Sequence, residues 1–135
     1  MKFAIEAEDA IIGIICGLLV ITYTGKLYPL KLNEFVYVAA FVVFIIFIIL
    51  DVINEFKDWS QIGLTLLSIA HNAIDFVIAL AFISHFSGLN MPYITSTLVP
   101  YLQNEQILLG AGIFLAVSNA VWLITMPFWM LFHQP

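Results

Sequence analysis

Four long runs of apolar residues, separated by short polar segments, dominate the pattern of the chain. The runs cover residues 10–24, 35–53, 62–83 and 107–132. A helix needs about 20 residues to cross the ~30 Å hydrocarbon core of a bilayer. The third and fourth runs reach that length, and the second reaches it if Asp51 lies at the membrane interface, with Glu55 in the polar connection that follows. The pattern predicts an all-α bundle of four transmembrane helices, formed as one domain by residues 1–135.

The first run is the shortest of the four. It spans a bilayer only if Ala7 and Leu27 extend it or if the bilayer thins locally. A second arrangement is therefore kept, in which three helices cross the membrane and the N-terminal segment lies at the interface. The sequence predicts no orientation, because Lys2 and Lys57 flank one side of the four-span arrangement and Lys26 and Lys31 flank the other.

The composition supports a membrane environment and excludes one class of partner. Of the residues, 63% are hydrophobic and 10% are charged, whereas soluble domains have about 25% charged residues. So few polar groups would not cover the apolar side chains in water, so we expect an integral, multi-pass membrane protein that contacts lipid. The net charge is −5 and the only four basic residues are lysines. Nucleic acid is not expected as a partner, since phosphate binding requires clustered cations.

Small residues recur on two of the predicted helices. Gly13 and Gly17 have the GxxxG spacing that lets helix backbones approach closely. A similar stripe on the fourth run consists of Gly110, Gly112, Ala116 and Ala120. These residues predict helix packing, either within the bundle or between subunits.

The second run has no interior polar residue except Tyr37, which predicts a helix that faces lipid or an apolar partner on every side.

The candidate chemistry lies in the middle of the third and fourth runs. His71, Asn72 and Asp75 are close to the midpoint of the third, Ser68 lies one turn earlier, and Asn119 is near the midpoint of the fourth. His71 and Asp75 are four residues apart and share a helix face. Ionisable residues inside a membrane are costly and mark functional sites by default. If the two helices are neighbours, these side chains form one polar layer across the bundle.

Three interpretations of this layer are open. It relays protons or cations through Asp75 and His71, it binds a metal, or it is a hydrogen-bonded network that fixes helix register. A metal site requires three or four protein ligands. His85 lies ~21 Å along the helix from His71, which is too far to complete such a site.

The spacing of His71 and His85 resembles a pattern of a known family. Their fourteen-residue separation resembles the H-x13-H spacing with which one helix of the cytochrome b family holds two stacked haems. The resemblance covers one helix and two residues, His71 and His85. In that family a second helix supplies a matching pair, whereas this chain has only His133 besides. The resemblance therefore implies at most one haem, shared with a partner chain.

The leading functional expectation is a small accessory subunit of a multi-subunit membrane complex, or of a homo-oligomer. Small-residue stripes, a second run that is apolar on every side and the small mass outside the membrane favour it. The alternative is a transporter or channel that moves protons or cations with Asp75 and His71, and a haem- or metal-bearing redox subunit comes third. No catalytic activity and no cofactor are otherwise predicted. Cys16, for example, has no charged neighbour in its apolar run.

Overall fold

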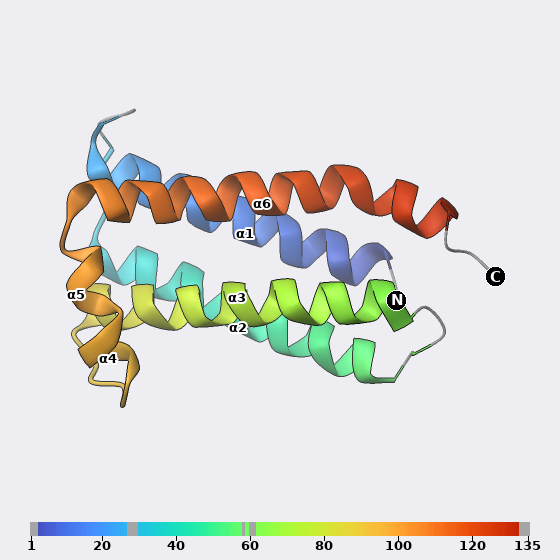
Figure 1. Cartoon of the computed structure of the whole chain (residues 1–135). Coiled ribbons are helices and arrows are strands. Elements are labelled where there is room, and N and C mark those ends of the chain that lie inside the picture. The colour runs from blue at the N-terminus through green and yellow to red at the C-terminus, as the bar shows by residue number, and fades with distance from the viewer. Residues whose placement is uncertain (1–2, 27–29, 58, 60–61, 133–135) are drawn as a thin grey trace.

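The chain folds into a bundle of four long helices, as the hydrophobic pattern predicts. The computed structural model describes residues 3–26, 30–57, 59 and 62–132, with side chains between residues 7 and 128. Successive long helices run antiparallel, so α1 begins and α6 ends at the same end of the bundle (Figure 1). The long helices are α1 (Phe3–Thr24), α2 (Glu34–Phe56), α3 (Ile62–Ser87) and α6 (Glu105–Phe132). Each contains a stretch that is long and apolar enough to cross a membrane, which confirms the four-helix membrane fold.

The first helix is longer than the apolar run that predicted it. α1 begins at Phe3, so Asp9 lies inside the helix, and its apolar stretch from Ala7 to Thr24 has 18 residues. α1 packs against both α6 and α2. The N-terminal segment is therefore one of the four bundle helices, and three spans with a separate interfacial helix do not describe this arrangement.

α2 differs from its prediction because one of its faces is buried. Every third or fourth residue turns inward, namely Tyr37, Phe41, Phe44, Ile48, Asp51 and Glu55. The prediction of a helix apolar on every side was wrong, since this stripe ends in two acids. The helix also continues to Phe56, past the predicted end of the span. Asp51 and Glu55 consequently lie inside the bundle with 0% exposure, and Glu55 belongs to the helix and not to the connection that follows it.

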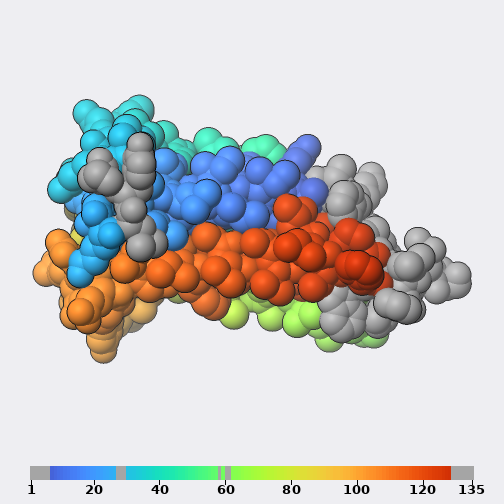
Figure 2. Space-filling model, turned by 90° about the horizontal axis from the view of Figure 1, so that it is seen from above, coloured from blue at the N-terminus to red at the C-terminus, as the bar shows by residue number. Residues whose placement is uncertain are grey.

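Small residues let α1 and α6 approach each other very closely. Gly13 lies against Asn119, and Gly17 lies against Gly112 and Ala116. A Cβ atom on Gly17 would lie 2.6 Å from the backbone nitrogen of Ala116 and 2.6 Å from the carbonyl oxygen of Gly112. The surfaces of the two helices meet along their length (Figure 2). These glycines therefore serve helix packing within the chain.

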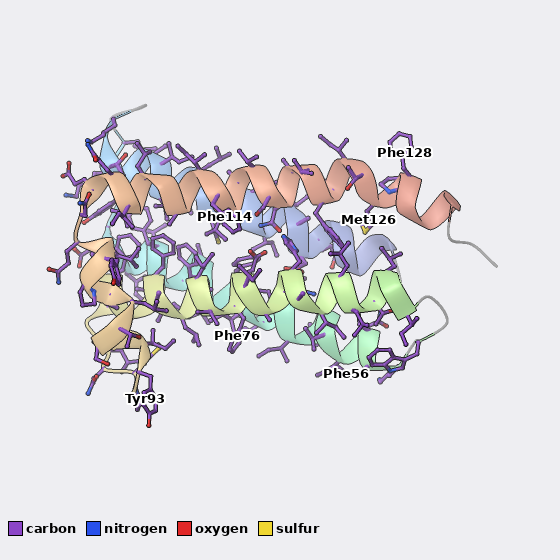
Figure 3. All side chains as sticks on the ribbon, in the orientation of Figure 1. Phe56, Phe76, Tyr93, Phe114, Met126 and Phe128 are labelled. Carbon is purple, nitrogen blue, oxygen red and sulfur yellow. The ribbon has the colours of Figure 1, made fainter. Side chains whose placement is uncertain are left out.

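Gly110, another member of the small-residue stripe, does not share this contact. A Cβ atom on Gly110 would meet no atom within 4 Å, and Gly110 is exposed on the outer face of α6. Ala120 is only partly buried. Large apolar side chains also cover the outer faces of the bundle, and Phe128 is one that points away from it (Figure 3). Gly110 thus lies on the outer surface of the bundle.

Aromatic rings fill the bundle core in the half opposite to the start of α1. The ring of Phe41 stacks on Phe82 with centroids 4.9 Å apart, and Tyr37 stacks on Phe86 at 4.9 Å. Tyr23 meets the Tyr37 and Phe86 rings edge-on. These five residues, which we call the aromatic half, come from α1, α2 and α3 and hold the three helices together at this end.

Two short helices cover the end of the aromatic half. α4 (Ile94–Thr97) and α5 (Val99–Leu102) lie in the long connection between α3 and α6 and pack against α3. Ser84, which is buried in α3, donates a hydrogen bond to the carbonyl oxygen of Leu89 at 2.7 Å and also contacts the Thr95 hydroxyl. These bonds anchor the connection on the bundle. The ring of Tyr93 remains 83% exposed and points away from the helices (Figure 3).

The close contact between α1 and α6 predicts a position-specific cost of one methyl group. Gly17→Ala should lower the free energy of unfolding by about 1–3 kcal/mol, because the added carbon meets backbone atoms that move only with their helix. Gly110→Ala is the matched control on α6, and it should be neutral or should stabilise by up to about 1 kcal/mol through helix propensity. Denaturant titration of the purified protein in detergent measures both. Equal stability of the two variants would show that α1 and α6 do not touch at Gly17.

Candidate functional site

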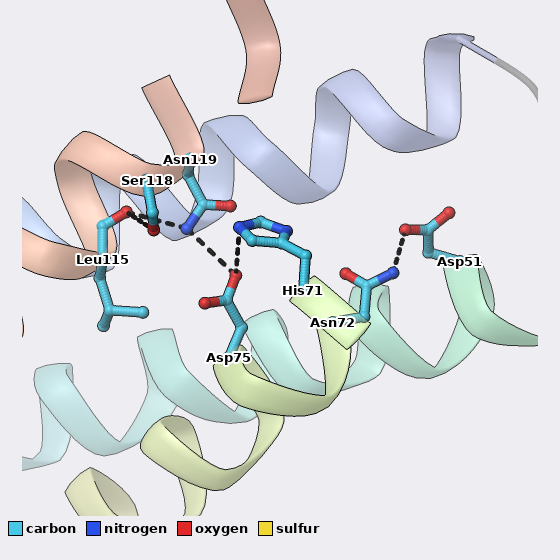
Figure 4. A network of polar contacts seen from close by, with 7 residues as sticks. All are labelled: Asp51, His71, Asn72, Asp75, Leu115, Ser118 and Asn119. Carbon is cyan, nitrogen blue, oxygen red and sulfur yellow. Dashed lines mark hydrogen bonds and ion pairs between the residues drawn. The ribbon is translucent and has the colours of Figure 1, made fainter. Parts of the chain in front are cut away.

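Asp75 lies near the middle of α3 and is the centre of the candidate site. Its side chain is 0% exposed, and its Oδ2 atom accepts a hydrogen bond from Asn119 Nδ2 of α6 at 3.1 Å (Figure 4). The Asn119 amide also donates to the carbonyl oxygen of Leu115 at 2.8 Å, which holds it against its own helix. The structure thus brings together the two side chains that the sequence placed at the same depth on separate helices.

His71 lies one turn from Asp75 on the same face of α3. Its Nε2 atom is 3.6 Å from Asp75 Oδ2, a distance just beyond a normal hydrogen bond. The imidazole ring stacks on the indole of Trp122 in α6, with centroids 5.2 Å apart and an angle of 16° between the planes. Trp122 therefore fixes the plane of the ring and leaves Nε2 directed at the carboxylate (Figure 4).

These contacts bridge a wide seam between two helices. The backbones of α3 and α6 approach each other much less closely than those of α1 and α6. Two side-chain pairs bridge the seam near the bundle centre, Asp75 with Asn119 and His71 with Trp122. A seam built from side chains leaves room for small shifts of polar groups, which a seam of touching backbones does not.

Two more buried acids link α2 to α3. Asn72 Nδ2 donates a hydrogen bond to Asp51 Oδ2 at 2.6 Å, and the Ser68 hydroxyl donates to Glu55 Oε1. Sequence reasoning found Asn72 and Ser68 but missed both of their partners. The sequence did contain a signal for both acids. Positions 51 and 55 continue the spacing of three and four residues at which the inward-facing side chains of α2 recur from Tyr37 onward.

Asp9 is a fourth buried acid that sequence reasoning missed. It lies on α1 with 3% exposure, in the same half of the bundle as Asp51 and Glu55. Together the buried polar residues of this half are Asp9, Asp51, Glu55, Thr65, Ser68, Asn72, Asp75 and Asn119, with His71 partly buried among them. We call this set the acidic half. It occupies the part of the core between the bundle centre and the end at which α1 begins.

Three buried oxygen atoms of the acidic half lack a hydrogen-bond donor within the described part of the chain. They are Asp75 Oδ1, Asn119 Oδ1 and Asn72 Oδ1. A buried acceptor without a donor costs about 1–3 kcal/mol. Two of the three belong to the pair at the centre of the bundle. An added proton, a water molecule or a cation would supply the donor or positive charge that these oxygen atoms lack.

The histidines and acids do not form a metal site among the residues that the structure describes. No group of three His, Cys, Asp or Glu side chains there is arranged to hold a metal ion. His85 lies at the other end of the bundle, beside Phe86, where it lines a cavity of about 520 Å³ with Lys31 and Glu105. His133 lies outside the described residues. The haem interpretation stays a prediction.

Comparisons with protein-family models, with curated proteins and with solved structures found no match to this chain. The functional interpretation therefore depends on the geometry of the acidic half.

The bond between Asp75 and Asn119 predicts a measurable loss of stability on its removal. Asn119→Ala should lower the free energy of unfolding by about 1–3 kcal/mol, because the buried carboxylate loses its donor. Ser118→Ala is the neighbouring control and should stay within about 0.5 kcal/mol of wild type, since among the described residues the Ser118 hydroxyl bonds only to the carbonyl oxygen of Leu115 in its own helix. Thermal unfolding in detergent compares the two. If both variants melt like wild type, the bond across the seam does not hold the bundle together.

Proposed function

We propose that this protein handles protons in a membrane, with Asp75 as the group that binds and releases the proton. The observation that carries the proposal is the position of Asp75, fully buried at the centre of a bundle of apolar helices, beside His71 and Asn119. Burying a carboxylate costs several kcal/mol, and intramembrane acids of this kind are typical of proton relays. Neutral polar side chains could fix the helix register without this cost of burying a charge, so a purely structural role does not explain the carboxylate.

Each neighbour of Asp75 has a distinct part in this proposal. His71 Nε2, 3.6 Å from the carboxylate, passes a proton to Oδ2 or takes one from it after a small movement of either group. Asn119 Nδ2 donates to the same oxygen and stabilises the carboxylate when the proton has left. Trp122 holds the imidazole in place by stacking.

A proton is favoured over a metal cation as the transported or bound species. Metal ions such as Mg²⁺ and Ca²⁺ take six or more oxygen ligands. In the described ranges no three acidic or histidine side chains meet at one point, and the carboxylates instead follow one another along α2 and α3. A row of separate acids with intervening hydroxyl and amide groups suits proton movement, for which each group needs only a neighbour.

The accessory-subunit role remains an untested alternative with less support. It depended on the small mass outside the membrane, which suits a transporter equally, and on two features of the helices, the small-residue stripes and an α2 that was apolar on every side. Gly13 and Gly17 pack against α6 of the same chain, and α2 turns inward a stripe that ends in two acids. Both features therefore have an explanation within the chain, and we rank proton handling first.

Proton flux into liposomes tests the proposal. The protein is reconstituted with a pH-sensitive dye inside, and a potassium gradient with valinomycin drives protons inward. Asp75→Asn keeps the shape and polarity of the side chain but removes the group that binds a proton. It should lower the flux by about tenfold or more. Glu8→Gln is the matched control, because it also removes one acid but from an exposed position on α1.

The control should retain the flux of the wild-type protein. Wild-type flux in Asp75→Asn would overturn the proposal, and so would a wild-type flux no greater than that of empty liposomes. The second result, together with stoichiometric co-purification of other membrane proteins, would favour the accessory-subunit role.

A further inference from the structure

The two halves of the bundle core have opposite chemistry. From Asp75 toward the start of α3, each turn places a polar group in the core: first Asn72 and His71, then Ser68, then Thr65. This series extends ~15 Å along the helix. Asp51 and Glu55 of α2 and Asp9 of α1 lie in the same half.

From Asp75 toward the end of α3, the core is apolar. On the face of α3 that carries Asp75, the next buried residues are Ala79, Phe82 and Phe86, which extend ~16 Å from it. Phe41 and Tyr37 of α2 stack on these rings. Among the polar residues that the structure shows as buried, only Ser84 lies in this half, and it is bonded to the connection at the far end.

We infer that, in this conformation of the bundle, Asp75 exchanges its proton with only one side of the membrane, the side on which α1 begins and α6 ends. Net flux to the other side then requires a second conformation in which the aromatic half opens. The acidic half is the access path, and the aromatic half is a barrier on the other side. This inference rests on the proposed function and adds the direction from which the site is reached.

Two observations support a path, as distinct from a set of buried acids. Asp75 Oδ1 and Asn119 Oδ1, both on residues with 0% exposure, receive no hydrogen bond from any residue in the described ranges. These acceptors lie at the inner end of the acidic half, where an incoming proton or water molecule would meet them. At the far end Tyr23 lines the cavity that also contains His85, Lys31 and Glu105, so the barrier is the part of the aromatic half between this cavity and Asp75. Among the described residues that part offers no such acceptor, and moving an ion through a packed apolar layer without polar partners is strongly unfavourable.

Side-specific reaction of introduced thiols with Ag⁺ tests this inference without measuring transport. Cys16→Ser first removes the only native thiol. Ser68→Cys then places a thiol in the acidic half, and Ala79→Cys places one beyond Asp75 on the same face of α3. Both positions have 0% exposure, so they are matched in burial. Ag⁺ is a small cation that follows narrow polar paths. It is added to one side of oriented proteoliposomes in chloride-free buffer, and thiols that remain are counted with a fluorescent maleimide after denaturation.

The thiol at position 68 should react about tenfold faster or more with Ag⁺ on the side of the termini than with Ag⁺ on the other side. The thiol at position 79 should react about tenfold more slowly than the one at position 68, from either side. If Ser68→Cys fails to fold, Thr65→Cys takes its place. Equal rates from both sides at position 68, faster reaction from the opposite side, equal rates at positions 68 and 79, or no reaction at either 68 or 65 would each overturn the inference.

The outcome is separable from the test of the proposed function. Wild-type flux in Asp75→Asn with one-sided labelling would remove the proton role and leave a polar path open to one side. Flux that depends on Asp75 with symmetric labelling would keep the proton role and remove the one-sided path.

Discussion

The cost of placing a carboxylate among apolar helices is the constraint on which the rest of this structure depends. Each such group loses several kcal/mol of hydration unless it is protonated or finds polar partners. The chain buries Asp75 and Asp51 completely and gives each an amide donor from another helix. Because these bonds cross between helices, they determine which faces of α2, α3 and α6 turn inward. The large apolar side chains on the other faces are then left for lipid.

The helices of the bundle meet in two kinds of contact, one close and one wide. Where α1 meets α6, glycine lets the backbones touch, and such a seam has no room for rearrangement. Where α3 meets α6, the helices are held apart by the His71–Trp122 stack and joined by Asp75 and Asn119. A rigid pair of helices on one side and an adjustable polar seam on the other allow a proton to reach and leave Asp75 through the acidic half without reorganising the bundle.

Hydrophobic patterning was sufficient for the fold and for part of the site. Four long apolar runs predicted four helices, and the equal depth of Asp75 and Asn119 predicted their meeting. The ends of helices are less well determined by sequence, since a polar residue near an end fits either the last turn or the connection. For this reason Asp51, Glu55 and Asp9 were not recognised as core residues. The glycine spacing indicated close packing, but it does not specify a partner helix, and only the structure shows that Gly17 meets α6.

The central claim is that Asp75 binds and releases protons from water while it lies inside the bundle. Infrared difference spectroscopy of the reconstituted protein tests this claim most directly, because a protonated carboxyl group has its own C=O band. The band that disappears in Asp75→Asn is assigned to this residue. The account predicts that its intensity changes reversibly as the bulk pH is moved between acid and alkaline values. A band that stays constant over the whole range, or no band from Asp75 at any pH, would contradict it.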